Sequence, residues 1–443
     1  MQRYFCQPGG AISGEIRVPG DKSISHRALI LGSVAEGDTE LRGVLESENC
    51  LATMAALRDL GVRIVRLGRN RVLIPGVGLD GLRAAPHALN LGSGATPLRL
   101  FMGLLAADKF DSTLLGDASL MRRPMERVAV PLRLMNADIS THNGLPPVSI
   151  RGGRHLQAID YELPVASAQL KSALLLAGLR ADGRTRVAEP VQTRDHTERL
   201  LSAFGVEVLR QYRGVAIEGG QTLRGTEIEI PGDFSSAAFF IVLGCLAAER
   251  GLTLRGVGIN PTRTGLLDLL GLMGADIRVR PKGEPEPPGR NTTQVVGEPL
   301  ADIEVRASRL RGITVPESMV TLTIDEFPVF FIAAACAEGE TLVRGVHELR
   351  VKESDRLAAM AEGLARLGVE HELLPDGLWI RGGAGFSGGS VDSHGDHRIA
   401  MAFAVASARA SGPLEIRDVA NVATSFPGFV QTAQAVGLPI EAV

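Results

Sequence analysis

One short pattern recurs six times along this chain of 443 residues, and it constrains the fold more than any other feature. In each copy a helix-like apolar stretch ends at a glycine or an asparagine, and a strand-like stretch follows. Both residue types tolerate the left-handed conformation that closes a helix C-terminus. The pivotal residues are Gly61, Asn136, Gly205, Gly274, Gly368 and Gly437. They are 75, 69, 69, 94 and 69 residues apart, so the chain is predicted to contain six similar units.

A second pattern lies upstream of these residues and supports the same repeat. Ala35–Gly43 and Ala337–Gly345 both begin with Ala-Glu-Gly and end with Arg-Gly, and weaker versions start at Ala181, Glu249 and Arg409. Each unit is therefore expected to contain strand, helix, strand, helix and strand. Coincidence is the alternative, because a helix followed by glycine and strand is common in α/β proteins, but both patterns recur in phase. The long spacing contains the Pro- and Gly-rich stretch 281–290, which predicts an exposed loop.

The two halves of the chain share a turn. Val18–Ser25 resembles Ile230–Ala237, and both contain Pro-Gly-Asp. Pro-Gly favours a turn, and Asp and Ser favour the start of a helix. We interpret these turns as crossings between two lobes, with a hinge near 19–21 and 231–233. One lobe would comprise residues 21–232, and the other residues 1–20 and 233–443.

Composition excludes several classes of protein. Lys and Arg number 47 against 50 Asp and Glu, and the net charge of −3 argues against a polybasic nucleic-acid binder. The longest apolar runs, Ala237–Ala248 and Phe327–Ala337, are too short to span a bilayer. The first twenty residues lack the apolar core of a signal peptide, so a cytoplasmic location is expected. The four cysteines are scattered, which disfavours a disulfide framework or a structural zinc site.

Each predicted unit carries a small polar stretch beside a buried apolar helix. These stretches are Lys22–Arg27, Gly92–Arg99, Ser167–Lys171, Asp233–Ser236, Ile324–Pro328 and Gly395–Arg398. Helix N-termini present free N–H groups and partial positive charge, so together they would form an anion site. Any one stretch alone is better explained as an ordinary helix cap. Six in phase favour a shared ligand surface.

Basic residues lie beside these turns and helix starts, and they strengthen the case for an anionic ligand. They are Arg122, Arg123, Arg194, Lys352, Arg356 and Arg398. Arg binds carboxylate and phosphate groups through two hydrogen bonds, whereas Lys acts as a point charge. For any single residue, ordinary surface charge is the alternative. A P-loop lysine, a Gly-x-Ser-x-Gly elbow and a His-Glu-x-x-His metal motif are all absent from the sequence.

The longest motifs resemble those of the 5-enolpyruvylshikimate-3-phosphate (EPSP) synthase family, and the similarity covers essentially the whole chain. They are Pro19–Arg27, Arg350–Arg356 and Asp396–Met401, with support from Arg194–Glu198 and Ser425–Pro427. The resemblance implies an α/β (α+β) fold of two lobes, each built from three βαβαββ-type repeats. It also implies transfer of the enolpyruvyl group of phosphoenolpyruvate to the 5-hydroxyl of shikimate 3-phosphate, with phosphate released through a tetrahedral intermediate. It implies a monomer without metal or organic cofactor, and no nucleic-acid or membrane partner.

The resemblance assigns roles to individual residues. Those implied to bind shikimate 3-phosphate are Lys22, Ser23, Arg27, Ser167, Ala168, Gln169, Arg194, Asp325 and Lys352. Those implied to bind phosphoenolpyruvate are Lys22, Ala95, Arg123, Gln169, Arg356 and Arg398. Asp325 and Glu353 are the implied proton-transfer acids, and Lys22 would stabilise developing charge. The division of acid and base roles among these three stays open.

Several positions depart from the commonest family pattern. Gly92-Ser93-Gly94-Ala95-Thr96 stands where the family usually has Gly-Asn-x-Gly-Thr. Ala168 replaces a common Ser, and Thr424 a common Lys. Ala95 and the stretch 117–120 resemble the class II, glyphosate-tolerant branch. We expect tolerance, because the Ala95 methyl would collide with extended glyphosate.

Three other functions are compatible with parts of the sequence. UDP-N-acetylglucosamine enolpyruvyl transferase shares the fold and the donor, but typically uses a loop cysteine, and residues 117–125 contain none. A non-catalytic binding protein for a phosphorylated metabolite would do better without Asp325 and Glu353 in its anion site. A nucleic-acid phosphate cyclase has little support from a net charge of −3 and an aromatic content of 4%.

Overall fold

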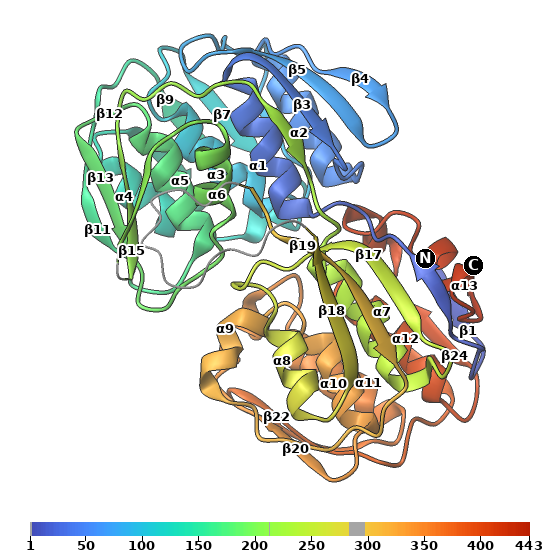
Figure 1. Ribbon diagram of the computed structural model, residues 1–443. Coiled ribbons are helices and arrows are strands. Elements are labelled where there is room, and N and C mark those ends of the chain that lie inside the picture. Colours follow the sequence, from blue (N-terminus) through green and yellow to red (C-terminus); the bar gives the residue numbers. More distant parts are fainter. Residues whose placement is uncertain (1, 212, 283–296) are drawn as a thin grey trace. The chain divides into compact units, whose positions relative to one another are not determined.

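The computed structural model describes residues 2–211, 213–282 and 297–443. Contacts divide these residues into two compact units (Figure 1). The first unit comprises residues 20–230 with 297 and 298, and the second comprises residues 2–19, 231–282 and 299–443. Each unit has its own hydrophobic core. The two units are described separately below.

The first unit contains three four-stranded sheets with one strand order. They are β16 (Glu227–Glu229), β3 (Glu36–Arg42), β5 (Arg71–Val77), β4 (Val65–Gly68); β6 (Leu89–Asn90), β7 (Ser112–Leu115), β9 (Leu145–Arg151), β8 (Asp138–His142); and β11 (Asp160–Glu162), β13 (Arg184–Ala188), β15 (Gly214–Glu218), β14 (Val208–Gln211). In each sheet the first two strands are parallel, and the others are antiparallel. A short pair, β10 (Leu156–Gln157) and β12 (Ala181–Asp182), lies outside this pattern.

The second unit repeats this arrangement. Its sheets are β2 (Gly14–Ile16), β17 (Leu252–Gly258), β19 (Leu300–Arg306), β18 (Asp276–Lys282); β20 (Glu340–Val343), β22 (Gly377–Arg381), β21 (Glu370–Leu374); and β23 (Gly389–Asp392), β24 (Leu414–Arg417), β1 (Arg3–Cys6), β25 (Ile440–Ala442). The three-stranded sheet has isolated parallel bridges at Arg311 and Thr314 where the others have a first strand. Six sheets of one topology confirm the predicted α/β fold class of βαβαββ-type repeats.

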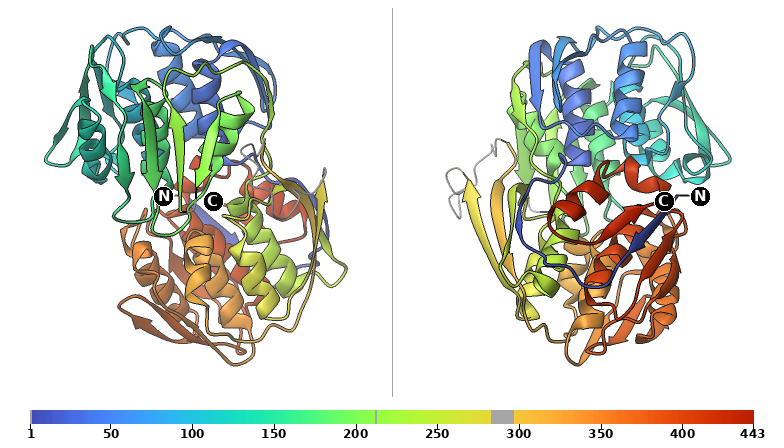
Figure 2. Two further views of the ribbon diagram at one scale, coloured as in Figure 1. Left: turned by 60° about the vertical axis from the view of Figure 1, so that its left-hand side comes forward. Right: turned by 90° about the vertical axis from the view of Figure 1, so that its right-hand side faces the viewer.

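Each repeat contains one buried helix that follows a parallel edge strand in the sequence. In the first unit these are α1 (Lys22–Ser33), α3 (Ala95–Leu105) and α5 (Ala168–Gly178); in the second, α7 (Phe234–Ala247), α10 (Phe327–Cys336) and α12 (His397–Ala406). Each packs on its own sheet and on the other buried helices of its unit (Figure 2). Their apolar residues face every direction, as in α10, where Phe327, Phe330 and Phe331 are fully buried. Burying one such side chain contributes roughly 1.5–3 kcal/mol, so these helices form the cores.

The second helix of each repeat ends near the predicted left-handed residue. These helices are α2 (Glu48–Asp59), α4 (Glu126–Leu134), α6 (His196–Ala203), α8 (Gly265–Leu272), α11 (Arg356–Arg366) and α13 (Phe429–Ala435). A short helix, α9 (Val320–Thr323), precedes α10. All six pivotal residues have positive φ, from 74° at Asn136 to 94° at Gly437. The cap prediction is confirmed at every copy.

The chain exchanges a strand at each Pro-Gly turn. β2 directly precedes α1 in sequence, yet it pairs with β17 of the second unit. β16 directly precedes α7, yet it pairs with β3 of the first unit. Gly20 is required at its turn, because a Cβ there would lie 1.8 Å from the Gly43 carbonyl oxygen. The N-terminal strand β1 lies between β24 and the C-terminal strand β25, so both ends of the chain share a sheet (Figure 1).

One loop prediction was partly wrong. Pro281 and Lys282 form the end of β18, because they pair with Ala301 and Leu300 of β19. The remainder of the expected loop, 283–290, lies outside the described residues. Among the described residues, no helix is long and apolar enough to cross a membrane.

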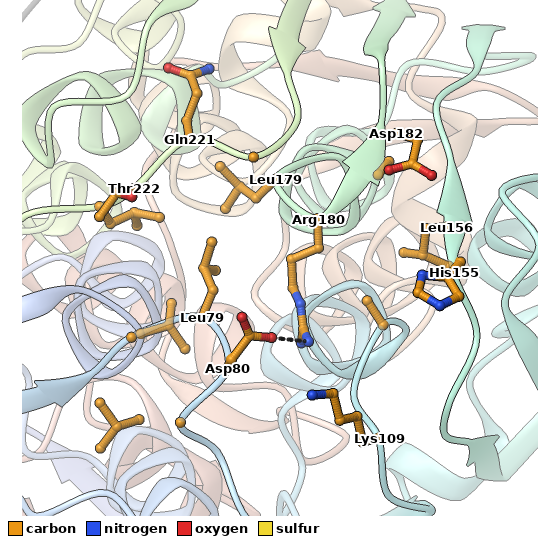
Figure 3. A pocket seen from close by; sticks show the side chains of 18 of the residues that line it. Leu79, Asp80, Lys109, His155, Leu156, Leu179, Arg180, Asp182, Gln221 and Thr222 are labelled. Atoms are coloured by element: carbon orange, nitrogen blue, oxygen red, sulfur yellow. Dashed lines mark hydrogen bonds and ion pairs between the residues drawn. The ribbon is translucent and has the colours of Figure 1, made fainter.

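A polar cavity lies where α1, α3 and α5 end (Figure 3). Its volume is about 750 Å³, and Val34, Ala107 and Leu179 line it just beyond the three helix ends. Arg180 crosses this region and binds Asp80 at 2.8 Å and Asp108 at 2.5 Å. The cavity is therefore separated by the length of the helices from their N-terminal ends.

Candidate active site

The predicted polar stretches coincide with the N-terminal ends of the buried helices. Lys22, Ala95 and Ala168 are the first residues of α1, α3 and α5. The Asp21 carboxylate accepts a hydrogen bond from the Ile24 N–H at 2.9 Å, and the Ser167 hydroxyl accepts one from the Leu170 N–H at 3.3 Å. The other first-turn N–H groups of these helices have no intrahelical acceptor and so favour an anion.

Arg27 links three helices of the first unit through neutral partners. Its Nε donates to the Thr197 hydroxyl of α6 at 2.7 Å, and its Nη2 donates to the Ser172 hydroxyl of α5 at 2.9 Å. Its Nη1 donates to the Ser23 carbonyl at 3.0 Å. Burial lowers the pKa of Arg27 to about 10, and the nearby Arg194 adds to this effect. Arg27 is still charged at neutral pH, and its field is available to an anion.

Gln169 joins the start of α5 to the start of α3. Its amide nitrogen donates to the Thr96 hydroxyl at 2.8 Å, and its carbonyl oxygen accepts a short hydrogen bond from Arg99. Arg99 also donates to the Pro124 carbonyl at 3.0 Å. Because Pro124 follows Arg123, this contact ties the predicted phosphoenolpyruvate-binding loop to both helix ends. Arg99 was missed as a site residue, although the stretch Gly92–Arg99 ends on it.

The loop that carries Arg123 is also bound to the Gly92–Thr96 stretch. The Asp117 N–H donates to the Gly92 carbonyl at 2.9 Å, and the Asp117 carboxylate accepts from the Leu120 N–H at 2.8 Å. Ser93, the unusual residue of this stretch, donates to the Asn49 side chain at 2.9 Å. The structure thus gives Ser93 a defined partner in α2.

In the second unit, Arg356 gathers three carboxylates. It is the first residue of α11 and is buried. Its Nε lies 2.8 Å from Asp396, its Nη1 lies 3.4 Å from Asp325, and its Nη2 lies 2.5 Å from Glu353. Burial alone would lower the pKa of Arg356, but the three carboxylates outweigh it and raise that pKa. In return, Arg356 holds the pKa of Asp396 below its ordinary value despite burial.

Asp325 is the centre of the remaining predicted residues of this unit. Its carboxylate lies 3.9 Å from the Lys352 Nζ and 3.8 Å from the Arg398 Nη2. Its carbonyl accepts a hydrogen bond from Arg398 at 2.9 Å. Lys352 also binds Glu348 at 2.7 Å. The structure therefore brings Asp325, Lys352, Glu353, Arg356 and Arg398 together in one cluster.

Glu326 belongs to the same cluster but was not predicted. It is buried, it accepts a short hydrogen bond from Ser235 at the start of α7, and it lies 3.8 Å from Arg398. Arg263 donates to the same Ser235 hydroxyl at 2.6 Å. The repeat held the signal: Glu326 is the N-cap of α10, as Asp233 is of α7 and Asp396 of α12. A second missed cluster, Lys171 with Glu189 and Glu198, lies behind Arg27 in the first unit.

The predicted residues thus form one group in each unit. The first unit positions Lys22, Ser23, Arg27, Ala95, Arg123, Ser167, Ala168, Gln169 and Arg194 at helix starts and the adjoining loops. The second positions the cluster around Asp325 and Arg356. Each group offers cations and helix N-termini to anions, and the second adds carboxylates able to exchange protons. Among the described residues, no group of three or more His, Cys, Asp or Glu side chains could hold a metal ion.

Comparison with known proteins gives one consistent family. The family model described as EPSP synthase (3-phosphoshikimate 1-carboxyvinyltransferase) matches residues 6–433. A 3-phosphoshikimate 1-carboxyvinyltransferase of Alkalilimnicola ehrlichii is 57% identical over 99% of this chain and 96% of its own. One from Methylococcus capsulatus is 55% identical over 99% and 98%. The solved structure of EPSP synthase from Acinetobacter baumannii matches with a TM-score of 0.90 and 49% identity, covering 100% of both chains.

Proposed function

The chain belongs to the EPSP synthase family, and we propose that it transfers the enolpyruvyl group of phosphoenolpyruvate to the 5-hydroxyl of shikimate 3-phosphate, releasing phosphate. This is a step of the shikimate pathway. The observation that carries the proposal is the match of nearly the whole chain to enzymes of this name, with the family's motif residues clustered at helix starts. The reaction joins two multiply charged anions, so it needs the cations that both groups supply.

Shikimate 3-phosphate is proposed to bind mainly to the first unit. Arg194 would take its phosphate, with the N-terminal end of α5 at Ser167 and Ala168, and Arg27 would bind the substrate beside them. Support comes from the neutral partners of Arg27, which leave its charge for a ligand. The remaining contacts carried over from the family are those of Lys22, Ser23, Gln169, Asp325 and Lys352.

Phosphoenolpyruvate is proposed to lie against Arg123, Arg356 and Arg398, with Lys22, Ala95 and Gln169 beside it. Arg356 is surrounded by carboxylates, so a ligand carboxylate must share or replace one of them. Glu353 is the most accessible of the three, with 36% of its side chain exposed, against 13% for Asp325 and 0% for Asp396. Displacement of Glu353 from Arg356 would also free it to exchange a proton.

Addition and elimination each require a proton to move at carbon and at oxygen. In the addition, the 5-oxygen attacks C2 of phosphoenolpyruvate, the hydroxyl proton passes to a base, and the C3 methylene gains a proton. In the elimination, the C2–O bond to phosphate breaks and the new C3 methyl loses a proton, so a C=C bond re-forms. Asp325 and Glu353 are proposed for these transfers. Lys22 would stabilise the charge that develops.

Phosphate release tests this proposal directly. We expect release only when shikimate 3-phosphate and phosphoenolpyruvate are supplied together, and we expect it to persist in EDTA. Each substrate alone serves as the control. If release occurs with UDP-N-acetylglucosamine in place of shikimate 3-phosphate, the proposed acceptor is wrong. If neither acceptor supports release while both substrates bind, the chain is a binding protein.

We also propose that the two units are lobes that close on the substrates. The hinge would lie near 19–21 and 231–233, with lobes of residues 21–232 and of residues 1–20 with 233–443. Support comes from the division of the proposed ligands, because Lys22 and Arg123 belong to one unit and Lys352 and Arg398 to the other. Small-angle scattering should show a smaller radius of gyration when shikimate 3-phosphate is added. An unchanged radius would count against closure.

Three further properties are proposed from the family resemblance. The enzyme would tolerate glyphosate through Ala95, act as a monomer and work in the cytoplasm. Light scattering during gel filtration tests the oligomeric state.

A further inference from the structure

A buried ion triplet lies in the first unit behind the proposed phosphate site. The Lys171 Nζ lies 2.6 Å from a Glu189 oxygen and 2.7 Å from a Glu198 oxygen. The exposed fractions of the three side chains are 1%, 6% and 5%. Burial alone would lower the pKa of Lys171, but the two carboxylates outweigh it and raise that pKa. The lysine is therefore charged.

Each acid of the triplet is connected to an arginine of the proposed shikimate 3-phosphate site. Glu189 accepts a hydrogen bond from the Thr193 N–H at 2.9 Å and another from its hydroxyl, which fixes the loop just before Arg194. Glu198 follows Thr197, whose hydroxyl accepts from Arg27. Glu198 is also the first among the charges that raise the pKa of Arg27, so the two side chains lie within electrostatic reach.

Without Lys171, the two carboxylates would compete with the substrate for the arginines. A carboxylate beside Arg27 and Arg194 competes with a substrate phosphate for the same cations. Lys171 binds Glu198 at 2.7 Å and so offsets its charge, and Glu189 keeps the loop of Arg194 in place through Thr193. Resting on the function proposed above, we propose that Lys171 is a positioning residue for shikimate 3-phosphate, because it neutralises Glu189 and Glu198 and so keeps the phosphate site cationic.

Removing the lysine and removing its partner should have opposite effects. Lys171→Met leaves two buried acids unbalanced, and Glu198 should turn toward Arg27. We expect the KM for shikimate 3-phosphate to rise by about tenfold or more, while the KM for phosphoenolpyruvate changes by less than about twofold. The double variant Lys171→Met/Glu198→Gln removes the competing charge, so its KM for shikimate 3-phosphate should return toward that of wild type. Glu198→Gln alone should not raise this KM.

A matched control lies at the other end of the same helix. Arg180, just beyond α5, also joins two carboxylates, Asp80 and Asp108, and it lines the polar cavity (Figure 3). Arg180→Met should lower thermal stability, as loss of a paired cation does, without changing either KM. This control separates a local electrostatic effect from a general loss of stability.

The measurements are steady-state phosphate release for both substrates, and calorimetric binding of shikimate 3-phosphate, with wild type and the four variants. The proposal is overturned if Lys171→Met keeps the wild-type KM, if the double variant is no better than the single one, or if Arg180→Met raises this KM equally. If Lys171→Met does not fold, the double variant, which keeps the net charge of the triplet, and Glu198→Gln still decide: a raised KM in Glu198→Gln contradicts the proposal. Failure of wild type to use shikimate 3-phosphate would instead refute the proposed function.

Discussion

Arg27 of the first unit and Arg356 of the second are both deeply buried arginines, and their surroundings are opposite. Arg27 is 4% exposed and bonds to two hydroxyls and a carbonyl. Arg356 is 1% exposed and bonds to three carboxylates. Accordingly, burial lowers the pKa of Arg27 to about 10, whereas the carboxylates outweigh burial and raise the pKa of Arg356. The same repeat thus supports two kinds of cation site.

Under the proposed function, this difference would separate substrate binding from proton transfer. A buried cation with neutral partners keeps its charge for a substrate anion, as the proposed binding of shikimate 3-phosphate by the first unit requires. A cation bonded to acids instead fixes those acids, so the second unit is prepared to orient Asp325 and Glu353. The variants below test this division, from the largest expected effect to the smallest.

The first test removes the proposed proton-transfer acids. Glu353→Gln and Asp325→Asn keep the size of the side chains but cannot exchange the proton, so kcat should fall by about 10²–10⁴-fold. Glu353→Gln should leave calorimetric binding of shikimate 3-phosphate nearly unchanged. The matched control is Glu348→Gln, which removes an acid that binds Lys352 but is 52% exposed. If Glu353→Gln and Asp325→Asn both keep a kcat within tenfold of wild type, Glu353 and Asp325 do not transfer the protons.

The second test compares the two buried arginines. Arg356→Met leaves three acids without their cation, so the free energy of unfolding should fall by about 3–5 kcal/mol. Arg27→Met should cost less stability, because Ser172 and Thr197 remain 2.7 Å apart and can bond to each other. Its effect should appear as weaker binding of shikimate 3-phosphate, by about 2–4 kcal/mol. Urea unfolding and calorimetry measure the two quantities. Equal losses of stability in the two variants would contradict the comparison.

The sequence predicts those structural features that depend on neighbouring residues, and it fails for those that depend on residues far apart in the chain. The six helix caps are local, because Gly61 and its counterparts need a left-handed backbone wherever the chain runs. The buried helices are local too, since their apolar runs leave no polar face. The strand exchange is only partly local: the Pro-Gly turn predicts a crossing between lobes, but nothing near β2 identifies β17 as its partner.

The same limit applies to the site. Motifs singled out Asp325, Glu353, Arg356 and Arg398, and the structure shows them in contact. The repeat marks Glu326 as a helix cap, but its partners Ser235 and Arg398, which place it in the cluster, lie far from it in sequence. Lys171 was missed because its two acids follow 18 and 27 residues later. Partners distant in sequence are found only when the sheet and helix packing is known.

The third test asks whether the proposed preference for phosphoenolpyruvate over glyphosate has a steric rather than an electrostatic origin. Ala95 is the first residue of α3 and is 9% exposed. It differs from the glycine that the family usually has by one methyl group. Ala95→Gly should make glyphosate bind more tightly by about 1–3 kcal/mol, which lowers the inhibitory concentration roughly 5–150-fold. The KM for phosphoenolpyruvate should change much less. If glyphosate inhibits wild type and variant equally, charge rather than shape controls selectivity.

The fourth test uses pH to weaken the first unit selectively. His26 is buried beside Lys22 and Arg27, and burial, aided by these two cations, lowers its pKa from 6.5 to about 3. Between these values the unfolded chain binds a proton that the folded chain does not. The stability that His26 contributes is therefore complete above pH 6.5 and is lost progressively as the pH falls toward 3. From pH 6.5 to 5.5 the loss should be about 1 kcal/mol.

In the second unit, Asp396 also has a lowered pKa, which lies below its ordinary value of 3.8 in the folded state. The stability that Asp396 contributes is therefore lost only when the pH falls below about 3.8. Acidification from pH 6.5 to 5.5 should therefore increase hydrogen exchange in α1 while α12 is little affected. Trp379, the one tryptophan of the chain, lies in β22 and reports on the second unit in parallel. His26→Gln should remove the increase in α1, because glutamine can keep a hydrogen bond to Thr53 without titrating. Equal acceleration of exchange in both units, or an unaltered pH dependence in His26→Gln, would show that the two halves do not differ in this respect.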